Sequence, residues 1–160
     1  MTDITWPSPF GYTDFCDDIR HEINGKVTLV GIYAAELSVY GQVPAVIPKL
    51  MLAIHYFERH EEASTPLQLR VFLPDDPEDA PSQSVDIPPR EYAALPPTDE
   101  DLRAAMNFAL QISPLIVTKS GLIKVRMVRG DDTIRLGSLR VKLLTEAEAI
   151  AAGLIQAPAI

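Results

Sequence analysis

Carboxylates are the residues of this sequence that could most readily do chemistry, and many of them come in adjacent pairs. A hard cation such as Ca²⁺ prefers roughly six to eight oxygen ligands, which carboxylates from separate loops can supply. The candidate metal ligands are the pairs expected in turns or at strand ends, Asp75, Asp76, Asp131 and Asp132. No calcium loop of fixed spacing is present. Acidic residues are also common in turns for another reason, because they keep the turn soluble and hydrogen-bond to its backbone. Calcium or small-ligand binding is therefore an alternative hypothesis, and we expect no resident cofactor.

A second group of charged residues surrounds the dipeptide Asn24-Gly25. Paired carboxylates serve acid–base chemistry when the fold places them in a cleft. An enzyme with a cleft near Asp17, Asp18 and His21 is a further alternative, but the sequence does not show such a cleft. We therefore assign this group to binding, with the candidate binding residues Asp17, Asp18, Arg20, Glu22 and Lys26.

Other chemistry-bearing residues lack partners in the sequence. Cys16 is the only cysteine, and a lone cysteine is usually a small buried hydrophobe. The three histidines are scattered and share no metal-ligand spacing. Neither a nucleophile motif nor a phosphate-binding glycine loop is present. We expect no catalytic residues.

The formal net charge of −8 argues against nucleic acid as a partner, because an acidic chain repels polyanions. The basic residues nevertheless gather toward the C-terminal end. Solvent-facing positions of two strands explain this clustering, and a local basic stripe is the alternative. The residues concerned are Lys119, Lys124, Arg126, Arg129, Arg135, Arg140 and Lys142.

Membrane and secretory signals are missing from the sequence. Residues 1–12 contain no Lys or Arg and no apolar run, so they do not form a signal peptide. The longest uncharged stretch, residues 104–118, is too short and too polar to span a bilayer. A single cysteine requires no oxidising compartment. We expect a cytoplasmic protein without a membrane partner.

The charged group around Asn24-Gly25 depends on a predicted hairpin. Both residues tolerate the positive φ of a tight hairpin turn, and residues 26–35 have a strong strand pattern. We therefore predict that residues 12–23 and 26–35 pair across this turn. A helix over residues 12–23 is the alternative, supported by the spacing of Phe15, Cys16, Ile19 and Ile23.

Alternating apolar residues predict further strands over residues 49–58, 67–73, 122–128 and 133–144, the last two joined by a turn at 129–132. Residues 74–97 hold seven of the 14 prolines and six acids, and form a long exposed excursion in which Val85 and Ile87 could make an edge strand.

The helix content is predicted to be small. Thr98 and the acids after it favour a short helix, followed by a strand up to Ile112, although residues 99–113 also fit a longer helix. Thr145 and Glu148 form a capping box that begins a closing helix ending near Gly153.

These elements predict a mainly β fold. We expect an antiparallel β-sandwich of seven or eight strands, with a short helix in the second half and a C-terminal helix. It would form one domain over residues 12–160, preceded by a flexible N-terminal arm at 1–11.

One stretch resembles a known family. It runs Cys16-Asp-Asp-Ile-Arg-His-Glu-Ile-Asn-Gly-Lys-Val-Thr-Leu-Val-Gly-Ile-Tyr33 and is followed by Ile47-Pro-Lys-Leu50. This pattern resembles a family of small uncharacterised bacterial and phage-associated proteins, most clearly over residues 14–56. The resemblance implies a β-sandwich and a strand at residues 14–23, and it implies no activity.

With no catalytic motif, the leading hypothesis is a non-enzymatic protein-binding or scaffold module. Its partner is an unknown protein. A homodimer is also expected, because the edges of a sandwich invite strand pairing.

Overall fold

The structure is a computed structural model that describes residues 7–59, 62–90 and 103–156. Its fold is mainly β, as the alternating patterns predict. The described residues form twelve strands, more than the seven or eight expected, and one α-helix. Most strand pairs are antiparallel, but β12 and β4 run parallel.

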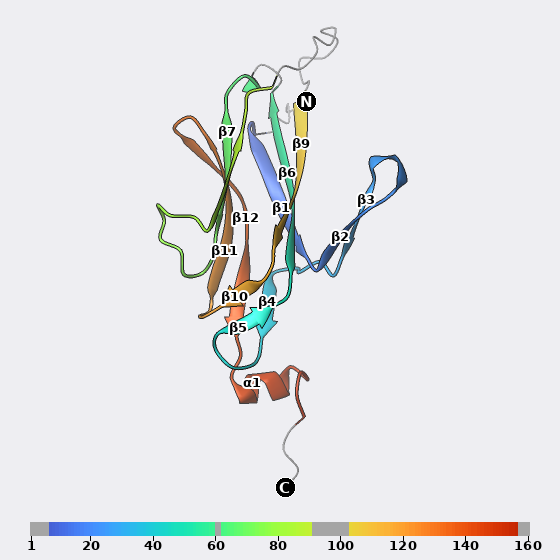
Figure 1. The fold of residues 1–160 in the computed structure, drawn as a ribbon, viewed down its shortest axis with the longest axis vertical. Coiled ribbons are helices and arrows are strands. Elements are labelled where there is room, and N and C mark those ends of the chain that lie inside the picture. The colour runs from blue at the N-terminus through green and yellow to red at the C-terminus, as the bar shows by residue number, and fades with distance from the viewer. Residues whose placement is uncertain (1–6, 60–61, 91–102, 157–160) are drawn as a thin grey trace, which may run out of the picture.

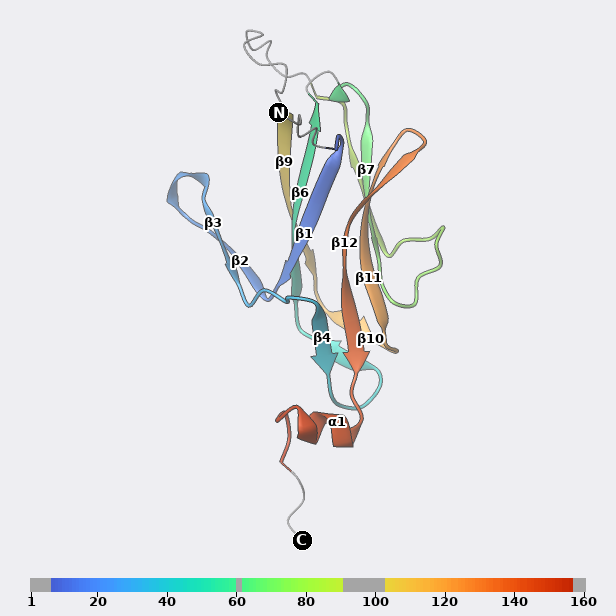
Figure 2. The same cartoon turned by 180° about the vertical axis from the view of Figure 1, so that it is seen from behind.

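Two larger sheets stand side by side along the length of the molecule (Figures 1 and 2). The three-stranded sheet has the order β1 (Phe10–Cys16), β6 (Leu50–Arg59), β9 (Arg103–Ile112). The five-stranded sheet has the order β4 (Glu36–Val39), β12 (Asp132–Leu143), β11 (Gly121–Arg129), β7 (Leu67–Phe72), β8 (Gln83–Ile87). Both sheets are open and have distinct edge strands.

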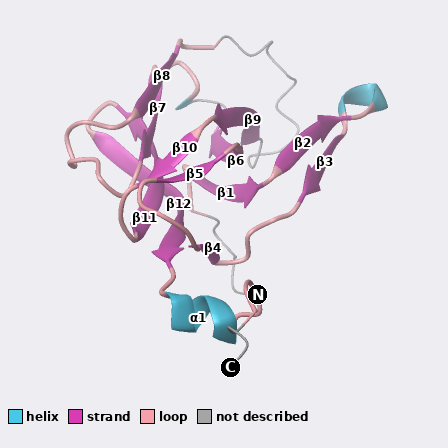
Figure 3. Cartoon of the chain, turned by 60° about the horizontal axis from the view of Figure 1, so that its bottom comes forward, coloured by secondary structure: helices cyan, strands magenta, loops and turns pink. Residues whose placement is uncertain are grey.

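Two small sheets complete the β structure. One pairs β5 (Ala45–Ile47) with β10 (Leu115–Val117), and the other pairs β2 (Asp18–His21) with β3 (Val27–Val30). The β2–β3 hairpin extends sideways from the two larger sheets, as all three overall views show (Figures 1–3). We call it the projecting hairpin.

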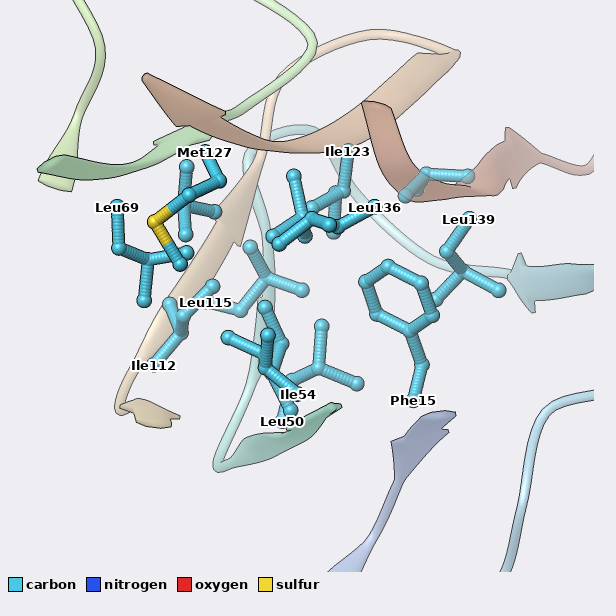
Figure 4. Close-up of a cluster of buried hydrophobic side chains, with 14 of the residues drawn as sticks. Phe15, Leu50, Ile54, Leu69, Ile112, Leu115, Ile123, Met127, Leu136 and Leu139 are labelled. Atoms are coloured by element: carbon cyan, nitrogen blue, oxygen red, sulfur yellow. The ribbon is translucent and has the colours of Figure 1, made fainter. Parts of the chain in front are cut away.

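The hydrophobic core lies between the two larger sheets, because period-two alternation turns one face of each sheet inward. In β6, Leu50, Leu52, Ile54 and Tyr56 are all fully buried. Figure 4 shows Phe15, Leu50 and Ile54 on one side of this core, with Ile123, Leu136 and Leu139 on the other.

The predicted hairpin at Asn24-Gly25 is confirmed. Asn24 and Gly25 have φ values of 67° and 73°, and β2 pairs with β3 in antiparallel register. The turn is longer than two residues, because three residues (Ile23–Gly25) separate Glu22 from Lys26. The backbone N–H of Glu22 donates to the carbonyl of Lys26 at 2.8 Å and closes the turn.

The prediction of one continuous strand over residues 12–23 is wrong, and so is the helix alternative. The chain breaks at Asp17, so that β1 pairs with β6 in the three-stranded sheet and only β2 belongs to the hairpin. Because β1 already begins at Phe10, the last residues of the predicted arm are part of the sheet. The strand after the turn ends at Val30, where Gly31 adopts a φ of 67°.

Several later predictions are confirmed. β6, β7, β11 and β12 occupy the expected segments, and Val85 and Ile87 lie in the edge strand β8. Residues 103–112 are strand β9, which excludes a helix there, while the short helix predicted at Thr98 lies outside the described residues. The helix α1 (Glu146–Ala151) has the predicted Thr145–Glu148 capping box. The sequence patterns did not indicate β4, β5 and β10, because each has only three or four residues.

Candidate functional site

Backbone hydrogen bonds and one tyrosine hold the base of the projecting hairpin. The Asp17 N–H donates to the Val30 carbonyl at 3.0 Å, and the Tyr33 N–H donates to the Phe15 carbonyl at 2.8 Å. The Tyr33 hydroxyl donates to the Asp17 carboxylate at 2.5 Å. Burial and this carboxylate raise the pKa of Tyr33 to about 12, so the hydroxyl stays protonated and able to donate.

An ion pair ties the first hairpin strand to the body of the protein. The Lys49 ammonium lies 2.5 Å from the Asp18 carboxylate, and Arg20 lies 3.6 Å from the same group. The hydrogen bond from Lys49, helped by Arg20, lowers the pKa of Asp18. The hairpin therefore leaves the body in a defined direction.

One face of the hairpin is polar. Cross-strand neighbours share a face, and the register pairs Asp18 with Val30 and Arg20 with Thr28. The Thr28 hydroxyl donates to Glu22 at 3.0 Å. This polar face carries Asp18, Arg20, Glu22, Lys26 and Thr28.

The opposite face of the hairpin is mostly apolar. Its cross-strand pairs are Ile19 with Leu29 and His21 with Val27. Val27 is 49% exposed, and Ile23 at the tip is 84% exposed. We define the apolar face as Ile19, Val27 and Leu29, extended by Ile23. No part of the chain that the structure describes covers the outer half of this face.

The structure brings together four of the five predicted binding residues. Asp18, Arg20, Glu22 and Lys26 share the polar face, whereas Asp17 lies at the base, bonded to Tyr33. Their role in binding stays a prediction. Sequence reasoning concentrated on the charges and missed the apolar face, although alternation on both sides of Asn24-Gly25 was a signal for it.

The structure does not bring Asp17, Asp18 and His21 together, so the three residues of the enzyme alternative share no single face. Asp18 and His21 lie on opposite faces of the hairpin, and the Asp17 carboxylate is engaged by Tyr33. Cys16 is fully buried, and burial is the largest cause that raises the pKa of its thiol, which disfavours the nucleophilic thiolate.

The four candidate metal ligands are not brought together. Asp75 pairs with Lys119 at 2.8 Å and accepts a hydrogen bond from Thr118. Asp76 accepts from the backbone N–H groups of Leu73 and Ser82 at 2.8 and 2.7 Å, which accounts for its position in the loop.

Asp131 and Asp132 lie at the other end of β7 and β11. The register pairs Arg129 with Leu67 there, whereas Phe72 pairs with Lys124 toward Asp75. Nowhere in residues 7–59, 62–90 and 103–156 do three or more His, Cys, Asp or Glu side chains gather in a way that could hold a metal ion. Nor is any helix in these ranges long and apolar enough to cross a membrane.

Comparison with known proteins yields one family. The model of DUF6941, a family of unknown function, matches residues 12–142 and therefore most of the chain. The predicted membership of an uncharacterised family is confirmed, while its bacterial or phage association stays a prediction. No curated protein and no solved structure matches the chain.

Proposed function

The chain belongs to the DUF6941 family, and we propose that it is a non-enzymatic protein-binding module whose contact element is the projecting hairpin. The observation that carries this proposal is the apolar face, whose outer half is exposed to solvent. This exposure contrasts with the base of the same hairpin, which hydrogen bonds and an ion pair hold in place. An amphipathic element normally buries its apolar side against another element. A two-stranded hairpin is also only marginally stable alone, so a partner would stabilise it.

The partner that we propose is a second copy of the chain. Residues 18–30 contain two acids, Asp18 and Glu22, and two bases, Arg20 and Lys26, so their formal charge is 2 − 2 = 0. Two such hairpins can approach without the repulsion expected from two chains that each carry −8. A two-fold axis would place one apolar face on the other and leave both polar faces in solvent.

Sedimentation velocity across a concentration series tests this proposal. We expect a reversible dimer for the wild-type chain at micromolar concentration. Val27→Glu should weaken the dimer by about tenfold or more, because it buries a charge in the apolar contact.

The matched control is Thr28→Glu, which adds the same charge to the opposite face of the same strand. It should leave the dimer within about twofold of wild type, a difference well under 1 kcal/mol. A wild-type chain that stays monomeric up to about 100 µM would rule out the second copy as partner. An equal loss in both variants would rule out the apolar face as the contact.

We further propose that the two larger sheets are the halves of an antiparallel β-sandwich and that the protein acts in the cytoplasm. Support for the sandwich comes from the shared core, to which both sheets contribute buried residues. The single cysteine, buried and free, supports a compartment that needs no disulfide.

A further inference from the structure

Three arginines form a row across the outer face of the five-stranded sheet. In the strand register, Arg126 of β11 is directly opposite Arg70 of β7 on one side and Arg135 of β12 on the other. Lys124 lies two residues along β11 from Arg126, on the same face. We call Arg70, Arg126 and Arg135 the arginine row.

The arginine row is unfavourable for a protein without a ligand. Like charges directly opposite each other on neighbouring strands destabilise a sheet. Burial and the neighbouring Arg135 both lower the pKa of Arg126, which shows that the positive charge of Arg126 is disfavoured at this position. Within the described residues, none of the ion pairs includes a member of the row or Lys124.

Neutral groups of the protein orient two of these guanidinium groups, Arg70 and Arg126. The Arg70 Nε donates to the Gln68 side-chain oxygen at 2.6 Å, and the Gln68 amide donates to Asp86 at 2.7 Å. The Arg126 guanidinium donates to the Val125 carbonyl at 2.9 Å. The described part of the chain thus orients two of the arginines without an ion pair, so their positive charges can still interact with an anionic ligand.

The arginine row lines a hollow of about 350 Å³ that also includes Lys124. Phe72 and Val128 give this hollow an apolar part, and the Thr133 side chain adds a hydroxyl group. Glu78, from the loop between β7 and β8, also lines the hollow, which therefore holds four cationic side chains and one carboxylate. That loop stands out from the sheet beside β11 (Figure 1).

We propose that this hollow is a binding site for a compact phosphorylated ligand, with the arginine row and Lys124 holding the phosphate. One guanidinium group can bind two phosphate oxygens at the same time. A phosphate also has more oxygens than a carboxylate, so several cations can contact it at once. The apolar part would contact the body of the ligand. The site is separate from the projecting hairpin and does not depend on the function proposed for it.

An extended polyanion fits this site less well than a compact one. The loop beside the hollow carries Asp75, Asp76, Glu78 and Asp79, and the whole chain has a net charge of −8. A long nucleic acid or acidic peptide would meet these charges as it left the hollow. Of these four acids, a small phosphate compound inside the hollow would meet only Glu78, against four cationic side chains.

Isothermal titration calorimetry with inorganic phosphate and pyrophosphate tests the site at low ionic strength. We expect wild-type protein to bind pyrophosphate with a Kd on the order of 10–100 µM, and phosphate more weakly. Arg126→Gln and Arg135→Gln should each weaken pyrophosphate binding about tenfold or more. Both side chains lie on the outer face of the sheet, so the fold should persist, and circular dichroism checks this.

The matched control is Arg140→Gln, because Arg140 is exposed on the same face but pairs with Leu122, outside the hollow. It should keep pyrophosphate binding within about twofold of wild type. Three results would overturn the proposal: no binding of either anion up to about 10 mM, an equal loss in Arg140→Gln, or row-dependent binding of single-stranded oligothymidylate or oligoglutamate that is tighter than that of pyrophosphate.

Discussion

At the scale of single residues, the direction of the projecting hairpin depends on Gly31. Its φ of 67° lies in the left-handed region, and a Cβ at this position would overlap the Asp17 carboxylate. That carboxylate is the group that the Tyr33 hydroxyl bonds. One glycine therefore allows both the bend of the chain and the side-chain bond at the hairpin base.

Replacing Gly31 should loosen this base. Gly31→Ala adds the cost of a left-handed alanine, about 1 kcal/mol, and also pushes Asp17 away from Tyr33. Gly25→Ala is the matched control, because Gly25 has a similar φ of 73° but open space around it. Amide hydrogen exchange of Asp17 and Tyr33 should accelerate about tenfold more in Gly31→Ala than in Gly25→Ala. Equal acceleration would show that the contact with Asp17 is unimportant.

At the scale of elements, α1 shows how a very short helix is held in place. Six residues are too few for a stable isolated helix. The Thr145 side chain accepts from the Glu148 N–H at 3.3 Å, and the Thr145 N–H donates to the Glu148 carboxylate at 2.9 Å. Lys142, near the end of β12, lies 2.8 Å from the same carboxylate, so the cap also joins the helix to the sheet.

Removing this cap should open the helix locally. Thr145→Ala is expected to cost about 1 kcal/mol, and hydrogen exchange at Ala149 and Ala152 should accelerate accordingly. Thr145→Ser keeps the hydroxyl and should retain most of the protection. Similar exchange in both variants would contradict the capping role.

The cap should also weaken in acid. Lys142 and the Thr145 hydrogen bonds lower the pKa of Glu148 to about 2. Because the pKa of Glu148 is lowered in the folded state, its carboxylate stabilises the helix at every pH above the ordinary pKa of a glutamate. This stabilisation is lost as the pH falls toward 2.

At the scale of the whole molecule, a buried carboxylate joins several distant segments. Glu58 of β6 is the only fully buried charged residue among those described, and it lies 3.3 Å from Arg90, which follows β8. Nearby, Arg129 of β11 pairs with Glu62 at 3.1 Å. Burial raises the pKa of Glu58, and Arg90 and Arg129 only partly oppose this effect.

Global stability should therefore carry a pH dependence of unusual sign. Between the ordinary and the raised pKa of Glu58, the folded state binds more protons than the unfolded state, so the free energy of unfolding falls as the pH rises. Each unit of raised pKa corresponds to about 1.4 kcal/mol. Urea unfolding between pH 4.5 and 7.5 should show that Glu58→Gln removes this decline.

Glu62→Gln is the control with the opposite sign. Hydrogen bonds from Arg59, Arg129 and Ser8 outweigh burial and lower the pKa of Glu62. Its contribution is fully present above the ordinary pKa and is lost as the pH falls below that value, so Glu62→Gln should leave the decline between pH 4.5 and 7.5 in place. Unchanged pH dependence in Glu58→Gln would show that the buried carboxylate has an ordinary pKa in the folded state.

The sequence by itself determined the mainly β class, the Asn24-Gly25 turn, the longer strands and the cap of α1. These features depend on local causes: alternation over five or more residues, positive φ at particular positions, and hydrogen bonds three residues apart. The sequence also located the charged residues of the hairpin and the clustering of basic residues near the C-terminal end.

Only the tertiary structure decided which strands pair and which side chains meet. Residues 10–16 pair with residues 51–57, far away in the sequence, and this pairing separates β1 from β2 at Asp17. Arg70 reaches Arg126 and Arg135 only through the register of three strands. No local pattern contains this information, because long-range pairing is set by how the apolar faces of whole sheets are buried.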